Sequence, residues 1–158
     1  MSIGRFIAGI GALIRDADSG RYLLLRRSAQ KDYGADDWEC VTGRVDQGES
    51  FTEALYREVM EELGVAVRID FFLQTTHFYR GEETPENELV GVLYCCSIKD
   101  PDAVKTSWEH SELRWVTKRE AVELLPEGHW LLALILRADT LHDLIPAELL
   151  AYYRSSVV

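Results

Sequence analysis

The alternation of apolar runs with turn residues at the start of the chain predicts a β-hairpin. Residues 6–14 form an apolar run typical of a buried strand, and residues 16–20 carry the Asp, Ser and Gly expected in a turn. Residues 21–27 have the pattern of a returning strand. The polar stretch 28–37 predicts a loop, and residues 38–41 predict a short strand after it.

The later part of the chain changes from extended to helical periodicity. Strands are predicted at residues 65–69, 75–80, 88–98 and 113–116, with a turn or loop at 81–87. Helices are predicted at residues 118–125 and 129–142 and from Pro146 onward, because proline is favoured in the first helical turn. The stripe that should pack on the sheet consists of Leu131, Leu134, Ile135 and Ala138. Together these elements predict an α/β fold with a mixed sheet between helical layers.

A helix of three to four turns is predicted at residues 51–63. Ser50 and Glu53 have the spacing of a capping box, and Gly64 suits the position just past a helix end. Between these signals there is neither proline nor glycine. The apolar stripe that this helix should bury contains Leu55, Val59 and Leu63.

Three glutamates of this helix have the spacing that gathers carboxylates on one face. Glu58, Glu61 and Glu62 are related by three and four residues, so they share an arc of about 100°. A rigid group of carboxylates suits a hard divalent cation such as Mg²⁺, which takes oxygen ligands. The alternative is an ordinary solvated acidic face.

The stretch from Gly43 to Val65 favours the metal. Its spacing is Gly, five residues, Glu49, seven residues, and then the run Arg57-Glu58-Val59-Met60-Glu61-Glu62-Leu63-Gly64-Val65. This stretch resembles the Nudix box of the Nudix hydrolases at every defined position. The resemblance implies an α/β/α sandwich with a mixed sheet and a loop-helix-loop catalytic motif. It also implies hydrolysis of a nucleoside diphosphate linked to another moiety, with water attacking phosphorus.

The same resemblance implies roles for the residues of the box. Arg57 and Glu49 would orient the carboxylates, and the backbone carbonyl of Gly43 would join the metal shell. Glu58, Glu61 and Glu62 would bind Mg²⁺ or Mn²⁺, with Glu58 the first choice as general base. A further metal ligand is expected from the segment before Trp115, where Glu109 is preferred by spacing and Glu112 is the alternative.

One departure from the family pattern bears on the substrate. Val41-Thr42 stands before Gly43, where many members have Pro-Gly. With Glu109-His110 ahead of Trp115, this is similar to the bacterial dihydroneopterin triphosphate pyrophosphatases, and it implies a nucleoside triphosphate-like substrate. Thr42 could equally be a neutral replacement. The alternatives left open are a nucleotide sugar, ADP-ribose or dinucleotide substrate, and a Nudix module that binds a nucleotide without catalysis.

Residues outside the box are candidates for substrate contact. Arg27, at the end of the second predicted strand, could pair with phosphate oxygens, although surface solubility is an alternative for it and for Arg26. Trp38 and Tyr79 could stack on a base or pterin ring, as could His77, but an aromatic residue in a strand more often belongs to the core.

Length, composition and charge bound the class of protein. The chain has 158 residues, of which 47% are hydrophobic and 28% charged, and we expect residues 1–158 to form a single domain. The formal net charge of −10 argues against binding to nucleic acid or an anionic membrane. The expected partner is a small phosphate-anhydride substrate, and a homodimer is left open.

The cysteines and the N-terminus bear on the compartment. Cys40, Cys95 and Cys96 form no C-x-x-C pair, and the two adjacent cysteines should point to opposite faces of a strand. Buried free thiols are therefore expected. The apolar residues 3–14 contain Arg5 and lack the layout of a signal peptide, so the sequence favours a cytoplasmic location.

Overall fold

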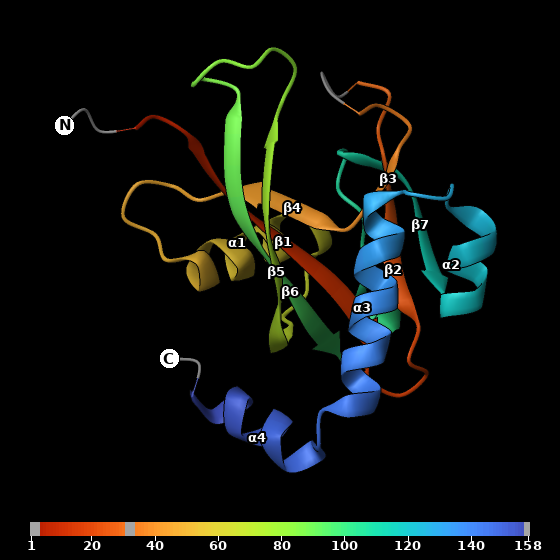
Figure 1. The fold of residues 1–158 in the computed structure, drawn as a ribbon. Coiled ribbons are helices and arrows are strands. Elements are labelled where there is room, and N and C mark those ends of the chain that lie inside the picture. The colour runs from red at the N-terminus through yellow and green to blue at the C-terminus, as the bar shows by residue number, and fades with distance from the viewer. Residues whose placement is uncertain (1–3, 31–33, 157–158) are drawn as a thin grey trace.

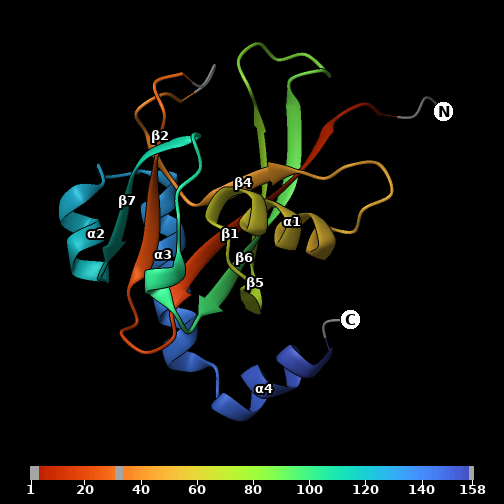
Figure 2. The ribbon, with the colours of Figure 1, turned by 180° about the vertical axis from the view of Figure 1, so that it is seen from behind.

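The structure is a computed structural model that describes residues 4–30 and 34–156. Within these residues one sheet of seven strands lies between helices on both faces (Figures 1 and 2). The strands are β1 (Ile7–Asp16), β2 (Tyr22–Arg27), β3 (Trp38–Glu39), β4 (Val41–Arg44), β5 (Arg68–Tyr79), β6 (Glu88–Ile98) and β7 (His110–Val116). The helices are α1 (Phe51–Leu63), α2 (Lys118–Leu124), α3 (Trp130–Leu144) and α4 (Ala147–Ser156), with a 3₁₀ turn at Pro101–Ala103.

Strand β1 organises the sheet. It runs parallel to β6 along its whole length, and β6 pairs with β5 antiparallel, so the sheet is mixed as expected. The other edge of β1 changes partner along its length. Residues Gly9 to Ala12 pair with β4, whereas Arg15 pairs with Tyr22 of β2. The sheet therefore divides along this edge, with β4 on one branch and β2, β3 and β7 on the other.

The two faces of the sheet carry separate hydrophobic cores. Helix α1 packs on one face through Leu55, Val59 and Leu63, and α3 packs on the other through a stripe with Leu134 at its centre. Figure 1 shows α3 in front of the sheet, and Figure 2 shows α1 in front of it. The buried residues of α3 are Leu131, Leu134, Ile135 and Ala138, as predicted. The α/β/α architecture is confirmed.

The three cysteines are free and buried, which confirms the expectation. Cys95 belongs to the core under α3, and Cys96 belongs to the core under α1, because neighbouring residues of a strand point to opposite faces. Burial raises the pKa of all three thiols.

Helix α1 has the ends that the sequence predicts. The Ser50 hydroxyl accepts a hydrogen bond from the Glu53 backbone N–H at 3.2 Å, and the Glu53 carboxylate accepts one from the Ser50 N–H at 2.8 Å. Gly64 ends the helix with φ at 68°, a left-handed conformation that glycine adopts without a Cβ clash. The catalytic candidates on α1 therefore stand on a helix that is fixed at both ends.

Several predicted boundaries are wrong. One continuous strand, β5, replaces the two predicted at 65–69 and 75–80, because two β-bulges interrupt the alternation on which the prediction depends. The predicted strand 38–41 is divided at Cys40 into β3 and β4, and β7 begins three residues early, at His110. Residues 31–33 of the predicted loop lie outside the described residues. Within the described residues no helix is long and apolar enough to cross a membrane.

Candidate active site

A cleft of about 770 Å³ opens where the sheet divides. Its wall includes Gly9 and Ile10 of β1, which pair with Arg44 and Gly43 of β4. Several candidates named from the sequence meet there although they come from separate elements. These are Gly43, Glu58, Glu62, Glu109, Arg27, Trp38 and Tyr79.

Among the residues that the structure describes, Arg57 forms ion pairs with four carboxylates, of which Asp46 is the most distant at 3.9 Å. Its Nε and Nη2 atoms donate to the two oxygens of Glu49 at 2.7 and 2.9 Å, and Nη2 also donates to the Arg44 carbonyl at 2.9 Å. Nη1 lies 2.9 Å from Glu58 Oε1 and 3.4 Å from Glu61 Oε2. The forked pair is a strong and directional contact, so Arg57 can orient Glu58 from one side. The hydrogen bonds from Arg57 lower the pKa of Glu49 to about 2.

Gly43 and Glu58 fit together only because Gly43 has no side chain. A Cβ built on Gly43 would coincide with the Glu58 carboxylate. The Glu58 carboxylate therefore lies directly against the backbone of β4. That the Gly43 carbonyl joins a metal shell stays a prediction. Carboxylate and carbonyl oxygens are the ligands that Mg²⁺ prefers, so the residues present fit such an ion.

Glu62 is buried at the base of the cleft, beside two residues to which the sequence analysis gave no role. The Glu62 side chain is 6% exposed, and its Oε2 lies 3.8 Å from His110 Nε2. The same nitrogen donates to Glu39 Oε1 at 3.1 Å, and both side chains of that pair are buried. His110 thus lies between two buried carboxylates, one on β3 and one on α1.

Glu39 joins this group to Arg27. Its Oε2 accepts from Arg27 Nη1 at 2.7 Å and from the Thr42 hydroxyl at 3.3 Å. The Thr42 hydroxyl therefore binds a side chain that lines the cleft. This contact is not expected if Thr42 is merely a neutral replacement for the usual glycine. The sequence gives no signal for Glu39, because a single acid within the predicted strand 38–41 is most simply a surface residue.

Glu61 and Glu112 lie away from the cleft wall. The Glu61 side chain is 61% exposed and contacts Arg57. Glu112 is in β7 and forms ion pairs with Arg114 and Arg26. Of the two downstream candidates, Glu109 is the one that the structure places in the wall of the cleft.

The three candidates for substrate contact all reach the cleft. Arg27 is held by Glu39, and the ring of Trp38 has the Arg114 guanidinium 5.3 Å from its centroid. Tyr79 lies edge-on to His77, which does not line the cleft.

Two further aromatic rings in the wall were missed by the sequence analysis. Phe78 and Trp130 line the cleft, and they are 39% and 42% exposed. Trp130 is the first residue of α3, where helical periodicity alone predicts packing rather than a cleft position. The preceding residue, His129, contacts the loop before β3, with its Nε2 2.9 Å from Asp37 Oδ1.

Comparison with protein families gives one match over most of the chain. The profile of the NUDIX domain family matches residues 5–138. A CTP pyrophosphohydrolase of Escherichia coli is 29% identical over 104 residues, which are 66% of this chain and 72% of that protein. A dihydroneopterin triphosphate diphosphatase of Haemophilus influenzae is 25% identical over 127 residues, with 71% of this chain and 75% of that protein covered.

An octanoyltransferase of Myxococcus xanthus is 30% identical over 106 residues, but the match covers only 29% of that protein and 67% of this chain. Among solved structures, a MutT protein from Methanosarcina mazei Go1 superposes with a TM-score of 0.72 at 26% identity. That superposition covers 90% of this chain and 99% of the other. The likeness therefore extends over most of the fold.

Proposed function

Because the chain belongs to the NUDIX domain family and is a hydrolase of phosphoric anhydride bonds, we propose that it cleaves a nucleoside triphosphate-like substrate into a monophosphate and pyrophosphate. The observation that carries the proposal is the convergence of Glu58, Glu62 and the Gly43 backbone in a cleft that also holds Arg27 and aromatic rings. The substrate can be a nucleotide or a dihydroneopterin triphosphate.

Nudix hydrolases generally need a divalent metal, and the proposed ion here is Mg²⁺ or Mn²⁺. The residues that would hold it are Glu58, Glu62 and the Gly43 carbonyl, with Glu109 of the cleft wall as a further ligand. Glu61 lies outside the wall but shares Arg57 Nη1 with Glu58, and it is proposed as an outer ligand. Such an ion, when bound, polarises phosphoryl oxygens and makes a water molecule more acidic.

The chain's own residues would then prepare the attack on phosphorus. Glu58 is the proposed general base that accepts the proton of the attacking water, and Arg57, anchored by Glu49, holds its carboxylate in place. This assignment agrees with the burial of Glu58, whose side chain is 15% exposed. A positioned base of this kind typically contributes about 10²- to 10⁴-fold to the rate.

The remaining walls fit the two ends of a nucleotide. Arg27, oriented by Glu39, would bind phosphate oxygens through its planar guanidinium. Trp38, Tyr79, Phe78 and Trp130 would contact a flat ring system. The cleft volume falls within the range of about 300–1,000 Å³ that is usual for small-molecule sites.

The two relatives named for a triphosphate support this choice over a nucleotide sugar or dinucleotide. The Val41-Thr42 pair before Gly43 supports it as well, through its resemblance to the dihydroneopterin triphosphate pyrophosphatases.

The test is a panel of purified substrates with Mg²⁺, in which release of pyrophosphate and of orthophosphate is measured separately. The panel should contain the common nucleoside triphosphates, dihydroneopterin triphosphate, ADP-ribose, a nucleotide sugar and a diadenosine polyphosphate. We expect pyrophosphate from a triphosphate. In H₂¹⁸O the label should enter the monophosphate, since attack is at the α phosphorus. Efficient cleavage of ADP-ribose or a nucleotide sugar, with little activity on any triphosphate, would reject the substrate class.

A further inference from the structure

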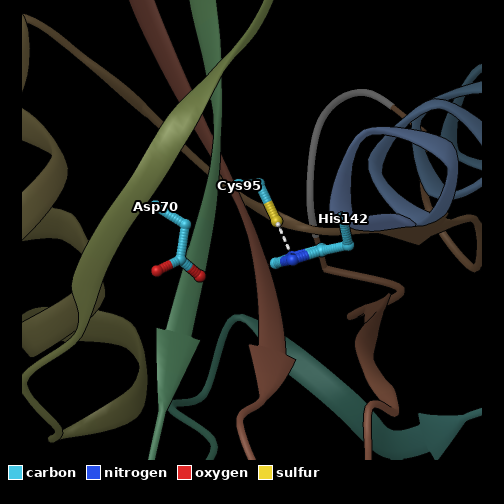
Figure 3. A group of neighbouring side chains, drawn as sticks. All are labelled: Asp70, Cys95 and His142. Carbon is cyan, nitrogen blue, oxygen red and sulfur yellow. Dashed lines mark hydrogen bonds between the residues drawn. The ribbon is translucent and has the colours of Figure 1, made fainter. Parts of the chain in front are cut away.

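A second group of metal-binding side chains lies on the face of the sheet opposite α1. Asp70 of β5, Cys95 of β6 and His142 of α3 each offer one ligand atom, and these atoms all lie within 4.8 Å of one another. Figure 3 shows the three side chains pointing toward a shared space, with Cys95 Sγ 3.5 Å from His142 Nε2. None of the three lines the cleft of the candidate active site.

Strand pairing brings the first two residues together. Asp70 lies at a β-bulge, where the register passes from Ile69 opposite Cys96 to Phe71 opposite Cys95. Asp70 and Phe71 thus both face Cys95, although successive residues of a regular strand point to opposite faces. Bulges commonly redirect a side chain in this way near functional sites.

The third residue comes from the helix that covers this face. His142 packs edge-on against Phe71, with 5.0 Å between the ring centroids. It is only partly buried, which gives an ion access to the group from solvent. Asp70 and Cys95, in contrast, are almost fully buried.

The Asp70 carboxylate is oriented by hydrogen bonds from neighbouring side chains, as metal-ligating carboxylates usually are. Its side chain has an exposed fraction of 0%, and its Oδ1 accepts from Ser97 Oγ at 3.1 Å and from Arg68 Nε at 3.4 Å. Such contacts orient ligating carboxylates in metal sites. Arg68 already supplies one positive charge beside this buried carboxylate, and a metal ion on its other side would add to that compensation.

The ligand set selects a class of ion. A thiolate, an imidazole and a carboxylate together suit Zn²⁺ or a similar transition metal rather than Mg²⁺, which prefers oxygen ligands alone. Tetrahedral zinc with its usual bond lengths would separate a sulfur and a nitrogen ligand by about 3.6 Å. The observed Sγ to Nε2 distance is 3.5 Å. The sulfur and the nitrogen therefore already stand at nearly the spacing that the ion requires, and the Asp70 oxygen lies within 4.8 Å of both.

We infer that Asp70, Cys95 and His142 form a transition-metal site of the Zn²⁺ type, with a fourth position for water, that ties β5 and β6 to α3. The thiolate is the form of cysteine that ligates a metal, so binding must release the proton of the Cys95 thiol. The site is independent of the carboxylates on α1, and its existence does not depend on the proposed substrate.

Cobalt(II) tests the site directly, because a thiolate ligand gives a charge-transfer absorption in the near ultraviolet and oxygen ligands do not. Metal-free full-length protein in excess Mg²⁺ is titrated with Co²⁺. We expect the band to saturate at one equivalent and to be lost on addition of Zn²⁺. Cys95→Ser should abolish it. Cys96→Ser is the matched control, since Cys96 is the next residue of β6 and faces the other core, and it should keep the band.

His142→Gln keeps the test decisive if the cysteine variant does not fold, because His142 is partly exposed. This variant should bind Co²⁺ at least about tenfold more weakly. Absence of a thiolate band in the wild type, or unchanged Co²⁺ affinity in His142→Gln, would overturn the inference. Neither outcome bears on hydrolysis, so the failure of this site and the failure of the proposed function are distinguishable.

Discussion

His110 Nε2 lies 3.1 Å from Glu39 Oε1, and the two residues are 71 positions apart in the chain. Because an ionised carboxylate only accepts hydrogen bonds, Nε2 carries the hydrogen of this contact. The pair joins β3 to the start of β7 beneath the cleft. Glu39 also holds Arg27, so one buried carboxylate connects the proposed phosphate-binding residue to the elements on either side of it.

Glu39→Gln should therefore destabilise the protein by about 1–3 kcal/mol, because the amide cannot accept from all the donors that the carboxylate serves. Urea denaturation measures the change in the free energy of unfolding. Glu112→Gln is the control, since Glu112 is a more exposed acid on β7, which pairs with β2 as β3 does, and it should change that free energy by less than about 0.5 kcal/mol. Equal stabilities of the two variants would show that the buried pair is not a structural support.

Replacing the cleft glutamates should remove activity without removing the fold. Glu58→Gln and Glu62→Gln keep shape and helix propensity but lose ligand charge, so we expect turnover to fall by about a hundredfold or more. Steady-state pyrophosphate release measures it. Glu53→Gln is the control on the same helix, because glutamine can also complete a capping box. Wild-type turnover of Glu62→Gln at limiting metal would mean that this face of α1 is not the metal site.

Local signals explain what could be predicted from the sequence. The ends of α1 depend on Ser50, Glu53 and Gly64, which act on the backbone within a few residues. The opposite directions of Cys95 and Cys96 follow from the two-residue period of a strand. Such features depend only on residues close together in the chain, so they can be predicted from a single sequence.

What the sequence could not show depends on distant pairing. The bulges of β5 break its alternation, and they are visible only against β6. In the sequence Glu39 is an ordinary polar residue. Its partners His110 and Arg27 lie on β7 and β2, and only the pairing of these strands places them next to Glu39. The position of Trp130 could not be predicted for the same reason. A helical pattern indicates which residues share a face, but it does not indicate that the helix begins at a cleft.

Gly43→Ala should impair catalysis through Glu58. The new methyl group would occupy the space of the Glu58 carboxylate, so the carboxylate must move away from β4. Displacing a catalytic group by about 1 Å can cost about a hundredfold in rate, and we expect a loss of that order in kcat. Far-ultraviolet circular dichroism checks that the fold persists. An alanine variant with full kcat would show that the contact between Gly43 and Glu58 is not required for turnover.

The pairing of Glu49 with Arg57 should persist in acid. The pKa of Glu49 is lowered from 4.5 to about 2, mainly by hydrogen bonds from Arg57. A lowered pKa in the folded state means that the pair adds stability above pH 4.5 and that this contribution is lost as the pH falls through about 2. Carboxyl-carbon NMR of metal-free protein should give a Glu49 midpoint near 2.

Arg57→Lys separates the hydrogen bonds from the charge, because lysine keeps the charge and loses the planar fork. Its Glu49 midpoint should rise toward 4.5. An unchanged midpoint in this variant would assign the lowered pKa to charge alone.

Mg²⁺ or Mn²⁺ should be required for turnover and should stabilise the fold. An ion that binds the folded chain and not the unfolded one stabilises it by about 2.7 kcal/mol at a hundredfold excess over its dissociation constant. Scanning calorimetry with and without Mg²⁺ measures the shift in melting temperature, and Glu62→Gln should lose most of it because the buried ligand is gone. Mg²⁺ is the better probe, since it avoids thiolate and imidazole ligands and so leaves the group around Cys95 unoccupied. A melting temperature indifferent to Mg²⁺, or full hydrolysis in excess EDTA, would contradict the metal assignment at α1.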